Sequence, residues 1–184
     1  MMREALFQFR KAHGLPEDGG VSRKWAKMKF GPVVFPMPNT KGRKRSLLYH
    51  DIHHIVTGYK GVLRGETRIG AWEVASGCGD HYSAWMYNLW ALALGLFLYP
   101  RATYEAFIRG RHSTNLYGGA RTEDELLNSS VEAVAESLSL STKDNRVTAS
   151  DGLAFVGWSL VAMVTLLVPP MLIVGVVLIL VNIV

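Results

Sequence analysis

Three polar residues within one helical turn, His50, Asp51 and His54, form the densest group in the chain that could do chemistry. In a helix, where residues advance by about 100° each, their side chains fall within one arc of the surface. Glu66 and Glu73 follow, about two turns apart, and so share a face of a second predicted helix. Two imidazoles and one or two carboxylates that converge from adjacent helices are good ligands for a divalent metal. The sequence therefore predicts a metal centre.

The elements that must position these residues can be placed from local signals. Ser46 is the predicted N-cap of the histidine helix, and the glycine-containing break at 57–61 turns the chain back before the glutamate helix. His53 lies beside the arc and is interpreted as an outer partner of the site or a surface residue. The scattered histidines, at positions 13, 81 and 112, are expected to be polar surface residues.

The spaced motif of His50, Asp51, His54 and Glu66 resembles the signature of the Coq-four family of ubiquinone (coenzyme Q) biosynthesis proteins. The segments LLYHDIHHIVTGY and RGETRIGAWEVASG are similar to that family's histidine helix, turn and glutamate helix. The resemblance covers roughly residues 25–140. It implies a mostly helical protein with a bound metal, usually described as zinc, and a long-chain polyprenyl-quinone precursor as its ligand. It also implies work at a membrane, as a homodimer and together with other quinone-biosynthesis enzymes.

Carried over residue by residue, the resemblance makes His50, Asp51, His54 and Glu66 the metal ligands. Glu73 falls where the family often has a second glutamate, and we assign it the catalytic role of shuttling a proton. The implied reaction is removal of the ring carboxyl with hydroxylation at the same carbon, by a metal-dependent oxidative decarboxylase of a prenylated hydroxybenzoate. Zinc has no redox chemistry, so an oxidative reaction requires iron, or substrate electrons with oxygen.

Two other functions remain open at this point. The chain could be a non-catalytic protein that presents a lipid or organises other enzymes, with a structural metal holding two helices together; a closed shell of four protein ligands favours this, and an open position favours catalysis. Adjacent His and Asp also occur in HD-type metal-dependent phosphohydrolases. That class usually needs a further upstream histidine and a distant aspartate, and His13 and Asp144, the candidates for these roles, lie in loop-like contexts that disfavour it.

Charge is distributed unevenly along the chain of 184 residues, whose formal net charge is +5. No acidic residue occurs from Ser22 to His50, where eight residues are basic: Arg23, Lys24, Lys27, Lys29, Lys41, Arg43, Lys44 and Arg45. Nucleic-acid binding is disfavoured, because no recognition motif follows and three prolines break the segment. Attraction to anionic lipid headgroups is the better interpretation.

Two apolar segments bear on the membrane and on the ligand. The run 84–99 is apolar on nearly every side and is expected to be either a buried central helix or a wall of a tunnel for a prenyl chain, with small residues such as Gly95 leaving room. The only cysteine, Cys78, is expected to be a buried thiol. The tail carries no charge from Gly152 to Val184. As one helix it would be about 50 Å long, beyond the roughly 30 Å hydrocarbon core. A hairpin with Pro169 and Pro170 at its tip is therefore predicted, and a single kinked span that starts near Trp158 is the alternative.

These observations predict an all-α protein with a helical core and a C-terminal hydrophobic hairpin, transmembrane or re-entrant. Residues 1–45 are expected to form an amphipathic start and a basic, proline-rich arm, residues 46–150 the metal-binding core, and residues 151–184 the membrane tail. Because the basic arm precedes the tail, the core is expected on the cytoplasmic side of a bacterial inner membrane. The predicted function is that of a membrane-associated metalloprotein of ubiquinone biosynthesis that binds a polyprenylated precursor and supports modification of its head group.

Overall fold

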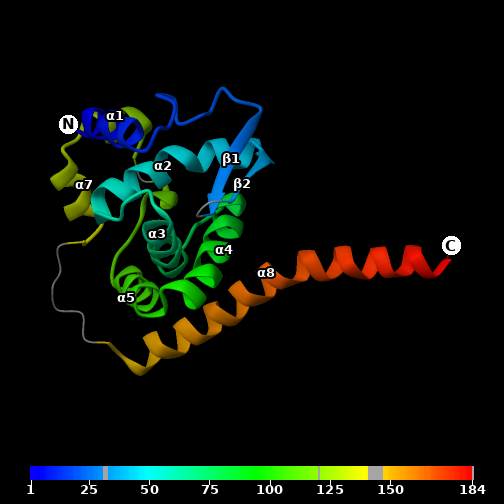
Figure 1. Ribbon diagram of the computed structural model, residues 1–184. Helices are drawn as coiled ribbons and strands as arrows, with labels where there is room; N and C mark the ends of the chain where they lie inside the picture. The colour runs from blue at the N-terminus through cyan, green and yellow to red at the C-terminus, as the bar shows by residue number, and fades with distance from the viewer. Residues whose placement is uncertain (31–32, 120, 141–146, 184) are drawn as a thin grey trace.

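The computed structural model describes residues 1–30, 33–119, 121–140 and 147–183, and this part of the chain is mostly helical (Figure 1). A two-stranded antiparallel sheet, which the sequence did not predict, lies between the first two helices. The elements, in chain order, are α1 (Met2–Ala12), β1 (Trp25–Phe30), β2 (Val33–Pro38), α2 (Lys41–Thr57), α3 (Leu63–Ser76), α4 (Tyr82–Leu98), α5 (Pro100–Arg111), η1 (Leu116–Gly118), α6 (Glu123–Asn128), α7 (Val131–Ser137) and α8 (Ala149–Ile183).

Helix α3 lies at the centre of the core, packed against α4 and α5. Trp72 on α3 and Phe107 on α5 are fully buried between these helices. Glycines let the backbones approach closely: a Cβ at Gly70 would lie 2.6 Å from the Cβ of Ala91 on α4. Gly95 likewise packs against Thr67 and Thr103. The expectation that Gly95 lines a tunnel is therefore wrong, because this glycine fills a helix contact.

The histidine helix α2 begins earlier than the sequence predicted. Thr40, rather than Ser46, is its N-cap, and the Thr40 hydroxyl accepts a hydrogen bond from the backbone N–H of Arg43. Ser46 lies within the helix and donates to the Arg43 carbonyl. The basic run was interpreted as part of an arm, but its second half forms the first turns of α2.

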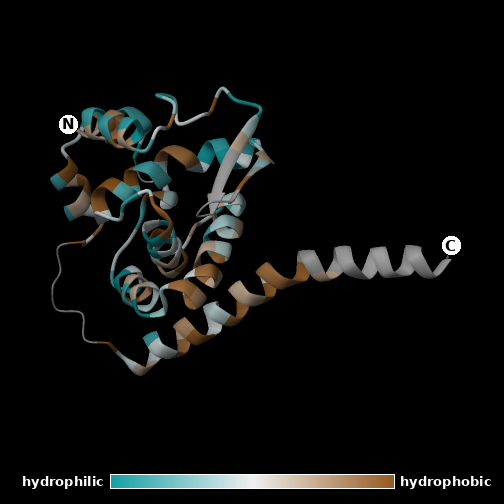
Figure 2. Ribbon diagram, in the orientation of Figure 1, coloured by the Kyte–Doolittle hydropathy of each residue, from teal (hydrophilic) through white to brown (hydrophobic). Residues whose placement is uncertain are grey.

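Helix α8 is one continuous helix from Ala149 to Ile183, so the structure does not confirm the predicted hairpin. Within the described residues it is the one helix long and apolar enough to cross a membrane, by its segment Ala149–Val168. Asp151 anchors its start, since this carboxylate accepts hydrogen bonds from Thr148 and Arg111. Figure 2 shows the apolar character of the helix where it runs along the core.

The first half of α8 belongs to the core on one side and is exposed on the other. Ala162 is fully buried, Phe155 packs edge-on against Tyr104 and Phe107, and Trp158 stacks on Trp85. The opposite side carries exposed apolar residues about one turn apart: Leu153, Val156, Leu160, Val164 and Leu167. The expected boundary between core and tail at residue 151 therefore cuts through a packed helix.

Two truncations test this division of α8. A chain that ends at Val168 keeps the packing of Phe155, Trp158 and Ala162, and we expect it to unfold cooperatively in mild detergent. A chain that ends at Asp151 loses these contacts, and removal of a single buried aromatic side chain already costs about 3–5 kcal/mol. Thermal unfolding followed by circular dichroism measures both. Equal stability of the two truncated chains would show that α8 adds nothing to the core.

Candidate metal centre

Three of the predicted ligands converge between α2 and α3. One ligand atom from each of His50, His54 and Glu66 lies within 4.8 Å of the other two. The Nε2 atoms of the two histidines are 3.2 Å apart, and the Glu66 carboxylate oxygens lie 3.6 Å from His50 Nε2 and 3.4 Å from His54 Nε2. A tetrahedral ion with bonds of about 2.0–2.1 Å separates its ligands by about 3.3–3.4 Å. The separations are close to these values, with Oε2 of Glu66 facing His50 and Oε1 facing His54.

The outer ring nitrogens of both histidines are occupied, and this fixes which nitrogen faces the cluster. His54 Nδ1 lies 2.7 Å from the carbonyl oxygen of Tyr59, which can only accept, so Nδ1 carries the proton. His50 Nδ1 lies 3.0 Å from Oε1 of Glu73, and it donates to that carboxylate in the same way. Both imidazoles therefore present Nε2 to the cluster, as histidine ligands do when an outer acceptor holds Nδ1–H.

A positive charge fits the centre of this cluster. With both Nδ1 atoms protonated, two Nε2 lone pairs face each other beside a carboxylate, an arrangement that is repulsive until a proton or a metal ion lies between them. Burial by itself lowers the pKa of His50, but the carboxylates of Glu73 and Glu66 outweigh it and raise that pKa well above its ordinary value. The residues present therefore fit a divalent cation, which would compete with a proton for His50 Nε2.

Glu73 is the buried acceptor beneath the cluster rather than one of the three converging groups. Its side chain is 0% exposed. Oε1 accepts from Nδ1 of His50 and, at 2.7 Å, of His53, while Oε2 accepts from the Tyr117 hydroxyl at 2.9 Å and from the Asn88 amide. Burial would raise the pKa of Glu73, but its histidine partners hold that pKa well below the usual range. Because four hydrogen bonds and a lowered pKa keep Glu73 ionised, it is poorly suited to pick up and release a proton. Its catalytic role stays a prediction.

His53 links this network to the loop after α5. Its Nδ1 donates to Glu73, and its Nε2 accepts the backbone N–H of Leu116 at 2.9 Å. His53 is fully buried, and burial lowers its pKa, which suits a neutral ring that uses both nitrogens. Tyr117, in the same loop, reaches Glu73. Asn88 and Tyr117 were not predicted from the sequence, because they lie outside the motif along the chain.

Asp51, the fourth predicted ligand, has another partner in this structure. Its Oδ2 accepts a hydrogen bond from Nε of Arg10 on α1 at 2.8 Å, and both side chains are buried. The structure brings together His50, His54 and Glu66, and it does not bring Asp51 into that group. Phe9, one residue before Arg10, stacks on His54. Helix α1 thus covers the centre and holds Asp51.

The other histidines lie outside the centre. His13 accepts the N–H of Gly61 through Nε2, and His112 pairs with Asp151 at 3.2 Å. His81 was expected at the surface, but it is buried, and its ring lies against Tyr117. Asp144, the distant aspartate considered for a phosphohydrolase, lies outside the described residues. Cys78 is a buried thiol, as the sequence predicted.

Replacing Asp51 separates the ligand role from the ion-pair role. We expect Asp51→Asn to lower the free energy of unfolding by about 3–5 kcal/mol, because it leaves Arg10 buried without its partner charge. The Arg10→Gln/Asp51→Asn variant should recover much of that loss. Metal bound per folded protein should stay near the wild-type value in both, and it should fall steeply in Glu66→Ala. Elemental analysis of purified protein measures it, and loss of metal in both Asp51 variants would make Asp51 a ligand.

Replacing Glu73 tests its positioning role. Glu73→Gln keeps the shape but removes the charge and one acceptor, and we expect metal affinity to fall about 10–100-fold, as for other outer partners of ligand histidines. Competition with a chelator measures the affinity. Tyr117→Phe, which removes one bond to the other carboxylate oxygen, is the matched control and should change affinity less. Unchanged affinity in Glu73→Gln would contradict the role.

Comparisons with other proteins add no assignment to this centre. No protein-family model, no curated protein and no solved structure matches the chain. The function is therefore inferred from the converging ligand atoms, their hydrogen-bond partners and the apolar helix α8.

Proposed function

We propose that this chain is a membrane-associated metalloprotein of ubiquinone biosynthesis, which binds a polyprenylated precursor and supports modification of its ring. The metal site in this proposal rests on the convergence of His50, His54 and Glu66. The Nδ1 atoms of both histidines donate to acceptors outside the cluster, which leaves Nε2 free to bind an ion. The pathway comes from the resemblance of the motif to the Coq-four family. That resemblance also supports a homodimer and association with other enzymes of the pathway.

Each residue of the centre has a distinct role in this proposal. His50, His54 and Glu66 hold the metal, and three protein ligands leave a position for a head-group oxygen, which favours catalysis over a closed structural site. A bound divalent ion would act there as a Lewis acid toward that oxygen. Glu73 and the Tyr59 carbonyl hold the two imidazoles in the required tautomer.

The donor set narrows the choice of metal. Two histidines and a glutamate suit zinc, the metal implied by the resemblance. Two histidines and one carboxylate are also the set found in non-haem Fe(II) oxygenases, so iron fits an oxidative decarboxylation with hydroxylation. Elemental analysis of protein purified without added metal separates zinc from iron.

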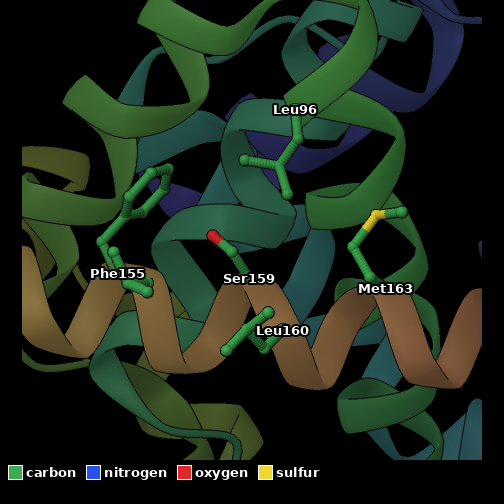
Figure 3. Close-up of a pocket in the computed structure, with 6 residues that line it drawn as sticks. Leu96, Phe155, Ser159, Leu160 and Met163 are labelled. Atoms are coloured by element: carbon green, nitrogen blue, oxygen red, sulfur yellow. The ribbon is translucent and has the colours of Figure 1, made fainter.

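An apolar groove along the surface of α8, beside Leu96 of α4, supports the lipid part of the proposal. It has a volume of about 270 Å³ and is lined by Leu96, Phe155, Val156, Ser159, Leu160 and Met163 (Figure 3). Leu96 follows Gly95, which packs against Thr67, and Thr67 follows the ligand Glu66. In this proposal the apolar lining of the groove accommodates part of the prenyl tail.

Helix α8 attaches the chain to the membrane in this proposal, with the core on the cytoplasmic side. The span is a single helix or a hairpin at Pro169 and Pro170, and accessibility of a cysteine placed at residue 183 distinguishes them by the side on which the C-terminus lies. Carbonate washing of native membranes should leave the protein in the pellet.

Deletion of the gene in the native host tests the function. We expect a prenylated ring precursor that still carries its carboxyl group to accumulate, and the quinone pool to fall; lipid mass spectrometry measures both. The wild-type chain and the control Glu4→Gln, an exposed change on α1, should restore the pool, and Glu66→Ala should not. An unchanged pool and unchanged intermediates in the deletion strain would contradict a role in this pathway.

A further inference from the structure

A basic surface lies at the start of β1, the end of β2 and the first turns of α2, and the start of α4 touches α2 there. Arg23, Lys24, Lys41 and Arg45 are exposed, and Lys44 is half-buried. Arg43 donates to Asn39, which in turn donates to carbonyls of Gly20 and Arg23 and so ties these segments together. The starts of α2 and α4 touch, since a Cβ on Gly42 would lie 2.6 Å from the Ser83 hydroxyl. We call this region the basic face.

The protein does little to neutralise the basic face itself. Arg45 pairs with Asp80 at 2.9 Å, and both of these side chains are more than half exposed. No acidic residue occurs in the first turn of α2, although the dipole of a helix favours anions there and opposes cations. Local helix stability therefore does not account for Lys41 and Lys44, and an external anionic partner would.

Two exposed aromatic side chains belong to the segments that form this region. Trp25, at the start of β1, is 58% exposed, and Tyr82, the first residue of α4, is 82% exposed. Tryptophan and tyrosine are enriched where a membrane meets water, because their rings are amphipathic. Cations beside such aromatics suit a lipid surface, and the sequence carries no groove-binding motif for nucleic acid.

Two tryptophans connect α4, whose start touches the basic face, to α8. Trp85, one turn into α4, stacks on Trp158 at 5.0 Å, and Trp90 donates to the Thr165 carbonyl at 3.1 Å. The first half of α4 thus lies along residues 158–165 of α8. In Figure 1 the C-terminal half of α8 leaves the core toward the side on which β1 and β2 lie.

We propose that the basic face docks on the anionic phospholipid headgroups of the leaflet that α8 enters. Lysine and arginine side chains contact the headgroup phosphates, and Trp25 and Tyr82 lie at the membrane–water boundary. This docking rests on the membrane attachment proposed for α8 and is independent of the metal and of the quinone precursor. Because α2 carries both the basic face and the two histidine ligands, docking holds the metal centre at a fixed height above the bilayer.

Hydrogen exchange of the full-length protein in lipid vesicles tests this proposal. The protein is reconstituted in phosphatidylcholine alone and in phosphatidylcholine mixed with phosphatidylglycerol. Each cation near an anionic leaflet strengthens attachment about fivefold, so we expect amides in the first turns of α2 and α4 to exchange at least about fivefold more slowly in the anionic vesicles. Amides in the middle of α3 serve as the internal reference. The protection should disappear at about 1 M salt, where charges are screened beyond about 3 Å.

Paired charge reversals make the test specific. Lys41→Glu/Lys44→Glu should abolish the lipid-dependent protection while the fold persists, since glutamates at the start of a helix are favourable. Arg3→Glu/Lys11→Glu, which changes net charge equally on exposed positions of α1, should leave the protection unchanged. Equal exchange in the two lipid compositions would overturn the proposal. So would equal loss of protection in both double variants, or protection by a DNA duplex but not by anionic lipid.

Discussion

The buried carboxylate of Glu73 is the interaction on which the rest of this structure depends. It is fully enclosed and accepts hydrogen bonds from two histidines of α2, an asparagine of α4 and a tyrosine of the loop after α5. An ionised carboxylate in the protein interior destabilises the fold unless it is fully hydrogen-bonded. Four elements must therefore come together around it at once, and the position of His50 follows from that requirement.

The two glutamates of α3 lie on opposite sides of the His50 ring. Residues two turns apart on a helix are separated by about 10 Å, which leaves room for an imidazole between them. Glu73 accepts a hydrogen bond from Nδ1 of His50. On the other side of the ring, Oε2 of Glu66 lies 3.6 Å from Nε2 of His50. The His50 ring thus connects the buried hydrogen-bond network of Glu73 to the half-exposed metal centre. The negative charge of Glu73 makes Nε2 of this ring more basic and so a stronger metal ligand.

The spacing of residues along the chain predicted the three converging side chains of the centre but not their hydrogen-bond partners. The separations within HDIHH, and from Glu66 to Glu73, place side chains on helix faces, and the structure brings His50, His54 and Glu66 together as those faces predict. The partners of Asp51 and Glu73 could not be read in this way. Arg10 and Tyr117 are more than forty residues from them along the chain, and only the tertiary packing of α1 and of the loop decides those contacts. The start of α2 was missed because its cap, Thr40, precedes a run of cations that is unusual at the start of a helix.

The central claim is that His50, His54 and Glu66 hold one divalent ion. X-ray absorption at the metal edge, measured on full-length protein purified from its own membranes, tests this most directly. We expect about one ion per chain, scattering from two imidazoles with the remaining ligands oxygen, and loss of that signature in His54→Ala. A protein with no bound metal, or a metal whose spectrum contains no imidazole, would contradict it.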